Sequence, residues 1–139
     1  LMFAARAQHL YQKILPALEQ GQWVLCDRFT DATFAYQGGG RGVAKGKIAQ
    51  LETLVQGEIR PDRVIWLDAP VETGMARARQ RGELDRFEQE NLEFFQRIRD
   101  SYRERAQADP ARYFRVDASL PLPDVSTQIS AFLREICFN

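Results

Sequence analysis

Asp27 and Arg28 place a carboxylate beside a guanidinium directly after the apolar run Trp23–Cys26. That run is typical of a short buried strand, so the pair is expected at the carboxyl end of the strand. Open parallel sheets bind ligands just outside the carboxyl ends of their strands. An acid and a base in this position suit a metal-bound phosphate, because a carboxylate can hold Mg²⁺ or a bridging water while a guanidinium pairs with phosphate oxygens.

The segment after this pair carries side chains that can hold a flat ring with polar edges. Thr33, Tyr36 and Gln37 supply a hydroxyl, an aromatic ring and an amide, and the glycine-rich stretch Gly38–Gly42 follows. Aromatic rings stack on flat groups, while hydroxyls and amides bond to polar edges. Together with the phosphate-binding pair, these residues predict a nucleotide site.

A second cluster consists of the arginines Arg77, Arg79, Arg81 and Arg86. At helical spacing, Arg77 and Arg81 share a face and Arg79 lies roughly opposite. A solvated helix surface would look similar, and that interpretation stays open. The alternative is an arginine-bearing lid hinged at Gly82, which would exclude water from a triphosphate and neutralise charge in the transition state. Arginine favours bidentate contact with phosphate.

Arg6 lies at the edge of the apolar stripe of the first predicted helix, beside Phe3 and Leu10. One interpretation is an arginine whose stem covers the core while its charged end reaches solvent. The other is an arginine that projects into a ligand cleft beside an aromatic ring. The pattern leaves both open. His9, the single histidine, has no nucleophile pattern near it and is interpreted as structural.

Three aspartates close predicted strands. Asp68 precedes Pro70 and a helix, which favours a capping or loop-starting role. Asp117 lies two residues before Ser119, which favours loop chemistry. Asp27 differs, because an arginine follows it directly and no helix has opened yet. A functional role is therefore favoured for Asp27.

Apolar periodicity divides the chain into helices that alternate with strands. The expected helices are a first helix to about Glu19, ended by Gly21; Lys47–Gln56; one opened by Pro70 and broken at Gly82; Phe87–Ala106; and a final helix led by Pro121–Pro123. The expected strands are Trp23–Cys26, Arg63–Ala69 and Tyr113–Val116. This order predicts an α/β fold, a parallel sheet with helices packed on it, in a single domain over residues 1–139. The first helix has no N-cap, so we expect a chain whose amino-terminal portion is missing.

Composition narrows the class of protein. The 139 residues include 19 acidic and 19 basic side chains, which disfavours nucleic acid as a partner because non-specific binders are usually basic. No apolar run approaches the length of a membrane span, so no membrane partner is expected. Cys26 and Cys137 lie far apart and are interpreted as reduced core thiols of a cytosolic protein.

Several blocks, in the right order, resemble the thymidylate kinase family and particularly its bacterial members. The most specific blocks are Asp27-Arg28-Phe29, Ala35–Gly42 and Arg81–Glu88. The resemblance covers nearly the whole chain. It implies a P-loop NTPase-like parallel sheet flanked by helices, with three of about five strands present here. It also implies a cytoplasmic homodimer that moves the γ-phosphoryl group of ATP to thymidine monophosphate with Mg²⁺.

On the acceptor side, the resemblance implies a role for each residue of the predicted nucleotide site. Arg28 would grip the acceptor phosphate, and Asp27 would help to organise Mg²⁺, water and that phosphate. Arg6 would meet the edge of the thymine, with Phe3 as the candidate for stacking on the base. The remaining residues would border the base or lie along the sugar: Thr33 and Gln37 in the first case, Tyr36 in the second.

On the donor side, the resemblance implies an arginine lid and an adenine pocket. Arg81 is the first candidate for the catalytic arginine. The supporting candidates for binding ATP are the other arginines of the cluster, Arg77, Arg79 and Arg86. Ala118 and Ser119 would lie near the adenine.

One motif of the family is missing from the sequence. The Gly-x-x-x-x-Gly-Lys-Ser/Thr loop, which cradles the phosphates of ATP, does not occur. Gly38–Gly42 does not replace it, because no buried strand feeds it and no lysine–hydroxyl pair follows. The first two strands of the family are also absent, and the first of them lies between the strands predicted at Trp23 and Val64. We therefore expect a gap in the sheet and little or no kinase activity for this chain alone.

Three other functions stay open from the sequence. One is a related nucleoside or nucleotide kinase with a different base preference. Another is a non-catalytic module that binds nucleotide or a protein partner through the remaining sheet. The third is a nucleic-acid-binding fragment that uses the arginine run, against which the neutral overall charge argues.

Overall fold

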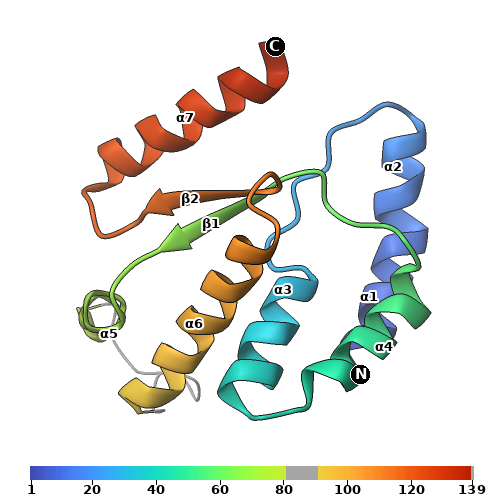
Figure 1. Cartoon of the computed structure of the whole chain (residues 1–139). Coiled ribbons are helices and arrows are strands. Elements are labelled where there is room, and N and C mark those ends of the chain that lie inside the picture. Colours follow the sequence, from blue (N-terminus) through green and yellow to red (C-terminus); the bar gives the residue numbers. More distant parts are fainter. Residues whose placement is uncertain (81–90, 139) are drawn as a thin grey trace. The chain divides into compact units, whose positions relative to one another are not determined.

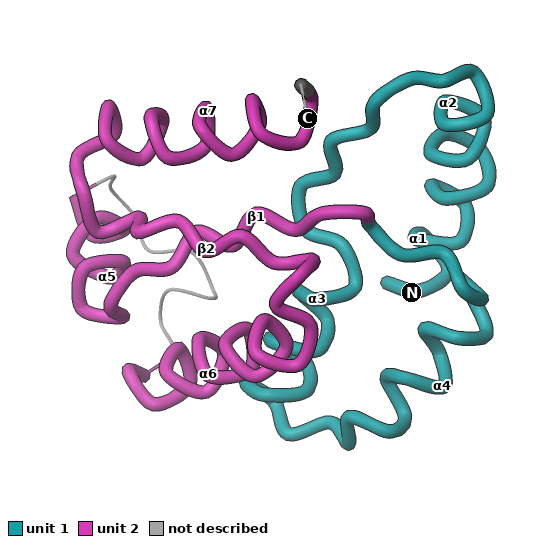
Figure 2. The backbone as a smooth tube through the Cα atoms, turned by 45° about the horizontal axis from the view of Figure 1, so that its top comes forward, with its two compact units in different colours: residues 1–61 teal, residues 62–139 magenta. Residues whose placement is uncertain are grey.

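The computed structural model describes residues 1–80 and 91–138, which form two compact units, Leu1–Pro61 and Asp62–Asn139 (Figure 2). Unit 1 is built from helices, and unit 2 holds a two-stranded parallel sheet flanked by helices (Figure 1). The predicted α/β class is therefore confirmed. That residues 1–139 act as a single nucleotide-kinase domain stays a prediction.

A helical run opens unit 1 and consists of α1 (Met2–His9), the π-helical stretch η1 (Leu10–Ile14) and α2 (Leu15–Glu19). Leu10 and Ile14 of this run are buried, with 0% and 8% of their surface exposed. Gly21 follows with a φ of +72°, a left-handed backbone that glycine adopts without a steric penalty. The helix predicted to end before Gly21 is confirmed.

The segment after Arg28 is also helical, which the sequence pattern did not predict. It forms α3 (Thr30–Thr33) and the π-helical η2 (Phe34–Gly40), and α4 (Lys45–Gln56) follows. Glycine costs a helix about 1 kcal/mol relative to alanine, so local propensity argued against helix here. Packing reverses that preference, because a Cβ on Gly38 would lie only 3.3 Å from the Cδ1 atom of Ile48 in α4. The absence of a side chain at Gly38 lets η2 approach α4 closely.

The predicted strand Trp23–Cys26 is wrong, because these residues have no regular secondary structure and lie outside the described sheet. Trp23 is 74% exposed and Leu25 is 96% exposed. A strand satisfies its backbone groups through a neighbouring strand, and no strand of the described residues pairs with this segment. Asp27 therefore does not stand at the end of a strand, and the described sheet has two strands instead of three.

The sheet of unit 2 pairs β1 (Val64–Asp68) with β2 (Tyr113–Asp117) in parallel, so that Asp68 lies opposite Asp117. The helix α7 (Leu122–Phe138) packs on one face through a stack of Phe114 on Phe132, with ring centroids 4.2 Å apart. The helix α6 (Leu92–Ala108) lies on the other face (Figure 1). These two predicted strands and the final helix are confirmed.

Two helices of unit 2 flank the residues whose placement is not described. The helix α5 (Val71–Gln80) follows β1, as predicted. The helix predicted over Phe87–Ala106 corresponds to α6 from Leu92 onward. Residues 87–90 lie outside the described ranges. Asn91 caps α6 by accepting a hydrogen bond from the Phe94 amide at 2.8 Å. This cap fixes the start of α6 at Leu92.

The cysteines differ from the expected pair of core thiols. Both are free, but Cys26 is half-buried and Cys137 is exposed near the end of α7. The core assignment is therefore wrong for Cys137, whose place on α7 faces solvent. In the described ranges, no helix combines the length and the apolar character needed to cross a membrane.

Candidate functional site

Arg6 is held by residues of α1 and α3 and by Phe29, the residue before α3. Its Nη2 atom donates to Thr33 Oγ1 at 2.9 Å and to the Phe29 carbonyl at 3.4 Å. Its guanidinium carbon lies 4.8 Å from the centre of the Phe3 ring and 5.4 Å from that of Phe29. The half-buried guanidinium therefore points toward α3 instead of into solvent, between two aromatic rings that attract a cation.

The electrostatic surroundings keep this guanidinium charged. Burial lowers the pKa of Arg6, while Cys26, Glu52 and Asp31 act in the opposite direction. An arginine remains protonated under such a shift because its ordinary pKa is so high. Burial also raises the pKa of the Cys26 thiol, which therefore stays protonated near neutral pH. Arg6 is thus the cationic group of the site.

Two buried polar atoms of unit 1 have no hydrogen-bond partner within the described part of the chain. They are the Nη1 atom of Arg6, a donor, and the Oε1 atom of Gln37, an acceptor. Gln37 lies in η2, one turn beyond Thr33, which contacts Arg6. Buried polar atoms are nearly always paired, and an unpaired one costs about 1–3 kcal/mol. Unit 1 therefore has one buried donor and one buried acceptor that lack partners among the described residues.

Arg28 adds an exposed cation next to the same helix. Its Nη2 atom donates to the Tyr36 hydroxyl at 3.2 Å, and its guanidinium lies 5.0 Å from the centre of the Tyr36 ring. Its backbone φ is +60°, the one positive value on a described residue other than glycine. Such left-handed conformations are uncommon for residues with a Cβ and are enriched at functional sites.

Among the described residues, no group of three or more histidine, cysteine, aspartate or glutamate side chains is arranged to hold a metal ion. Asp27 is exposed beside Arg28. Mg²⁺ commonly keeps several waters and binds through one or two carboxylates plus substrate phosphates. Asp27 therefore fits an indirect, water-mediated contact with a phosphate-bound Mg²⁺.

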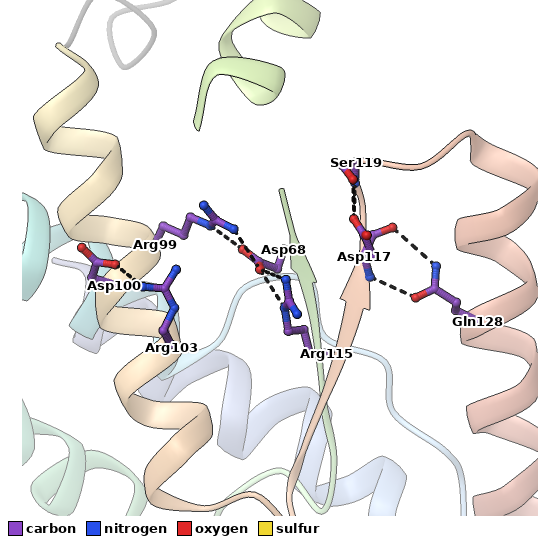
Figure 3. Close-up of polar contacts among 8 residues, drawn as sticks. All are labelled: Asp68, Arg99, Asp100, Arg103, Arg115, Asp117, Ser119 and Gln128. Atoms are coloured by element: carbon purple, nitrogen blue, oxygen red, sulfur yellow. Dashed lines mark hydrogen bonds and ion pairs between the residues drawn. The ribbon is translucent and has the colours of Figure 1, made fainter. Parts of the chain in front are cut away.

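Unit 2 contains a second charged cluster, at the carboxyl end of β1 (Figure 3). Arg99 of α6 donates from Nε to Asp68 Oδ1 at 2.6 Å and from Nη2 to Oδ2 at 3.2 Å. Arg115 of β2 donates from Nε to Asp68 Oδ2 at 2.7 Å, and its Nη2 lies 2.6 Å from the same oxygen. The side chain of Asp68 is only 2% exposed. The capping or loop-starting role expected for Asp68 is therefore wrong, because the carboxylate joins two arginines.

The two arginines control the ionisation of this carboxyl group. Burial alone would raise the pKa of Asp68, but hydrogen bonds from Arg99 and Arg115 outweigh it, and the net effect lowers the pKa. The same hydrogen bond to Asp68 raises the pKa of Arg99. The cluster is therefore charged and internally paired at neutral pH.

Asp117, which lies opposite Asp68 in the sheet, organises the loop after β2. Its Oδ1 atom accepts from the Ser119 amide at 2.9 Å and from the Ser119 hydroxyl at 2.5 Å (Figure 3). These hydrogen bonds lower the pKa of Asp117. Gln128 of α7 accepts from the Asp117 amide at 3.0 Å. The expected loop chemistry of Asp117 is confirmed.

The structure brings one predicted lid arginine to the predicted adenine-side residues. Arg77 on α5 donates to the carbonyl oxygens of Ala118 and Ser119, the latter at 2.9 Å. Arg79 lies on the same helix and is exposed. Arg81 and Arg86 lie outside the described residues. Within unit 1, the structure joins Arg6 to Thr33 and Phe3, and Arg28 to Tyr36.

Three residues of these sites and one helix cap were not found from the sequence. Arg99 and Arg115 lie 31 and 47 residues from Asp68, and no local pattern connects them. Phe29 belongs to the Asp27-Arg28-Phe29 block but received no role, because its contact with Arg6, 23 residues away, is not visible in the local sequence. Asn91 could have been found as a capping residue before an apolar run.

Comparison with known proteins identifies the family. The family model for thymidylate kinase matches residues 1–129. A thymidylate kinase of Teredinibacter turnerae is 56% identical over 96% of this chain and 65% of its own length. Those of Pseudomonas savastanoi pv. phaseolicola and Pseudomonas putida are 57% and 59% identical over 98% and 96% of this chain. The chain spans only about 65% of the length of these relatives. The chain belongs to the thymidylate kinase family.

Proposed function

We propose that the protein to which this chain belongs transfers the γ-phosphoryl group of ATP to thymidine monophosphate. The observation that carries the proposal is the pair of unpartnered atoms, Arg6 Nη1 and Gln37 Oε1. Thymine presents a carbonyl oxygen, which can accept from the arginine, beside an N–H group, which can donate to the amide oxygen. Cytosine presents an amino donor and a ring-nitrogen acceptor in the corresponding places. The site should therefore favour thymine over cytosine.

The other residues of unit 1 supply the remaining contacts of an acceptor nucleotide. Arg28 would bind the acceptor phosphate, since its guanidinium is exposed and, among the described residues, donates to the Tyr36 hydroxyl. Tyr36 would lie along the sugar, and Phe3 is the candidate for stacking on the base. Thr33 would border the base and hold Arg6 in place, which its hydrogen bond to Nη2 supports.

In the proposed reaction, an oxygen of the acceptor phosphate attacks the γ-phosphorus of ATP, and the bond to the β-phosphate bridging oxygen breaks to release ADP. Bound Mg²⁺ would neutralise phosphate charge, with Asp27 as an indirect contact. Arg81 is proposed as the catalytic arginine, with Arg79 and Arg86 in support, because the family resemblance assigns an arginine lid there. Catalysis of this kind depends on positioning and on charge stabilisation.

The phosphate-binding loop implied for this family is not in the printed sequence. We therefore propose that the chain alone has little or no kinase activity. A hybrid protein, here called the extended kinase, can test both statements: it joins the chain to the segment of the Teredinibacter turnerae relative that its match does not cover. A coupled assay with ATP, Mg²⁺ and thymidine monophosphate should show turnover for the extended kinase and none for the chain.

The assay should include two arginine variants of the extended kinase. Arg6→Met should raise the KM for thymidine monophosphate. Arg63→Met is the matched control, because Arg63 is exposed and, among the described residues, donates to the carbonyl of its neighbour Asp62. Failure of the extended kinase to use thymidine monophosphate, or equal use of cytidine monophosphate, would contradict the proposal.

We also propose that the parent protein is a homodimer, as the family resemblance implies. Helices of unit 1 expose apolar side chains that association could cover, such as Tyr11 at 58%, Leu18 at 44% and Leu54 at 80% exposure. Sedimentation of the extended kinase should give twice the mass of one polypeptide. A monomer at assay concentrations would contradict this part of the proposal.

A further inference from the structure

Arg77 uses its guanidinium in an unusual way for an exposed helix residue. Nη1 donates to the Ala118 carbonyl, and Nη2 donates to the carbonyls of Ser119 at 2.9 Å and Leu120 at 3.3 Å. These carbonyls belong to residues 118–121, here called the β2–α7 loop. The planar fork of arginine can hold several acceptors at once, which a single ammonium group does less well. Arg77 therefore ties α5 to the β2–α7 loop.

Other contacts fix the same loop from different directions. The Ala118 amide donates to the Asp68 carbonyl at 2.8 Å, which continues the hydrogen bonding between β1 and β2. The Ser119 amide and hydroxyl both donate to Asp117. Backbone amides and carbonyls of the loop thus have partners on β1, β2 and α5, and the Pro121 carbonyl accepts from amides of α7. A loop held in this way loses little conformational freedom when a ligand binds.

The position of the loop connects this arrangement with function. The β2–α7 loop leaves the carboxyl end of a parallel strand, which is the edge where open α/β sheets bind ligands. Ala118 and Ser119 are half-buried there. A guanidinium that already serves three carbonyls is poorly placed to follow a moving phosphoryl group. Its geometry suits a residue that shapes a binding surface.

We propose that Arg77 is a positioning residue that holds the β2–α7 loop in the shape that receives the nucleoside part of the phosphoryl donor. The inference rests on the proposed kinase function and deepens it. This positioning role distinguishes Arg77 from arginines that contact phosphates directly. Loss of the guanidinium should loosen the loop and weaken donor binding while the chemical step stays intact.

Amide hydrogen exchange on the chain tests the positioning step without any need for activity. Arg77→Ala should speed exchange of the Ala118 and Ser119 amides by roughly tenfold, since local opening sets the exchange rate. The exchange rates in Arg77→Lys should lie between those of Arg77→Ala and of the unmodified chain, because lysine keeps the charge but lacks the planar guanidinium group. Arg103→Ala is the control, since Arg103 pairs with Asp100 at an exposed place on α6. Unchanged exchange at both amides in Arg77→Ala would overturn the proposal.

Steady-state kinetics of the extended kinase test the functional step. Arg77→Ala should raise the KM for ATP about tenfold and change kcat by less than about twofold, which is the signature of lost ground-state binding. The KM for thymidine monophosphate should not change. A fall in kcat with an unchanged KM for ATP would overturn the positioning role and place Arg77 on the reacting phosphates. An inactive extended kinase without substitutions would count against the proposed function, and the exchange result would still decide whether Arg77 holds the loop.

Discussion

The Asp68 cluster of unit 2 and the Arg6 cluster of unit 1 differ in how fully their polar atoms are paired. In unit 2, both oxygens of Asp68 accept hydrogen bonds, and two arginines supply them. In unit 1, Arg6 has one terminal nitrogen bonded to Thr33, while Nη1 has no partner among the described residues. A buried network in which every polar atom has a hydrogen-bond partner stabilises one structure. A network with an unpaired donor and an unpaired acceptor can bind a ligand that supplies the missing partners. The first cluster should therefore matter for stability and the second for binding.

The largest effect should come from breaking the paired cluster of unit 2. Asp68→Asn keeps the size of the side chain and removes its charge, which leaves Arg99 and Arg115 without their counter-ion. We expect the free energy of unfolding to fall by about 3 kcal/mol, as for other broken buried pairs. Urea unfolding of the chain measures this loss.

The matched control is Asp100→Asn, which removes the same charge from an exposed pair with Arg103. It should cost less than about 0.5 kcal/mol, because exposed pairs of this kind contribute little. Equal losses in the two variants would show that the Asp68 cluster has no special structural role.

The next largest effect should come from Arg6→Met, and it should appear in binding instead of stability. Loss of a charge-assisted hydrogen bond should weaken binding of thymidine monophosphate by about 2 kcal/mol. The free energy of unfolding should change by less than about 1 kcal/mol, because the variant also removes an unpaired buried donor. Calorimetry and urea unfolding measure the two quantities. A large loss of stability with unchanged binding would reverse the comparison between the units.

Acid should weaken the paired cluster in a direction that follows from its ionisation. Because the folded pKa of Asp68 is lowered, the unfolded chain binds more protons as the pH falls below the ordinary aspartate value of about 3.9. The stabilisation from Asp68 is therefore complete above that value and is lost as the pH falls through the folded pKa.

The free energy of unfolding, measured between neutral pH and about pH 3, should decrease more steeply with falling pH for the unmodified chain than for Asp68→Asn. Asp117 shifts in the same direction and should account for part of the slope that remains in the variant. Identical slopes in the two proteins would contradict the lowered pKa of Asp68.

The smallest effect should come from the backbone of Arg28. Arg28→Gly and Arg28→Ala both remove the contact with Tyr36, but only glycine relieves the positive φ. The glycine variant should be more stable than the alanine variant by about 1 kcal/mol, the cost of a left-handed conformation for a residue with a Cβ. Thermal unfolding of the two variants measures the difference. A more stable alanine variant would show that the loop carries no such strain.

The sequence predicted those parts of the fold that depend on local pattern. Apolar periodicity predicted the strands that begin at Val64 and Tyr113 and the helix α7. Gly21 predicted the end of α2. The strand expected at Trp23 did not form, because a strand depends on a neighbour that periodicity cannot supply. The helix through Gly38 was missed because its cause is close packing on α4.

The residues of the candidate site also divide into those that local sequence predicted and those that it did not. Residues within one short block, such as Arg28 and Tyr36, were predicted together and contact each other. The role of Asp68 was missed because its partners lie 31 and 47 residues away in the sequence. Phe29 was overlooked beside Arg6 because only the folded chain brings the two together. Contacts between distant segments are the part that local patterns do not contain.

The central claim is that the open atoms of Arg6 and Gln37 receive the base of thymidine monophosphate. Its most direct test is a titration of the isotope-labelled chain followed by nitrogen–proton correlation NMR, which detects weak binding and needs no kinase activity. Thymidine monophosphate should shift the side-chain signals of Arg6 and Gln37, and cytidine monophosphate should shift them much less. Unmoved signals, or equal shifts with both nucleotides, would contradict the account.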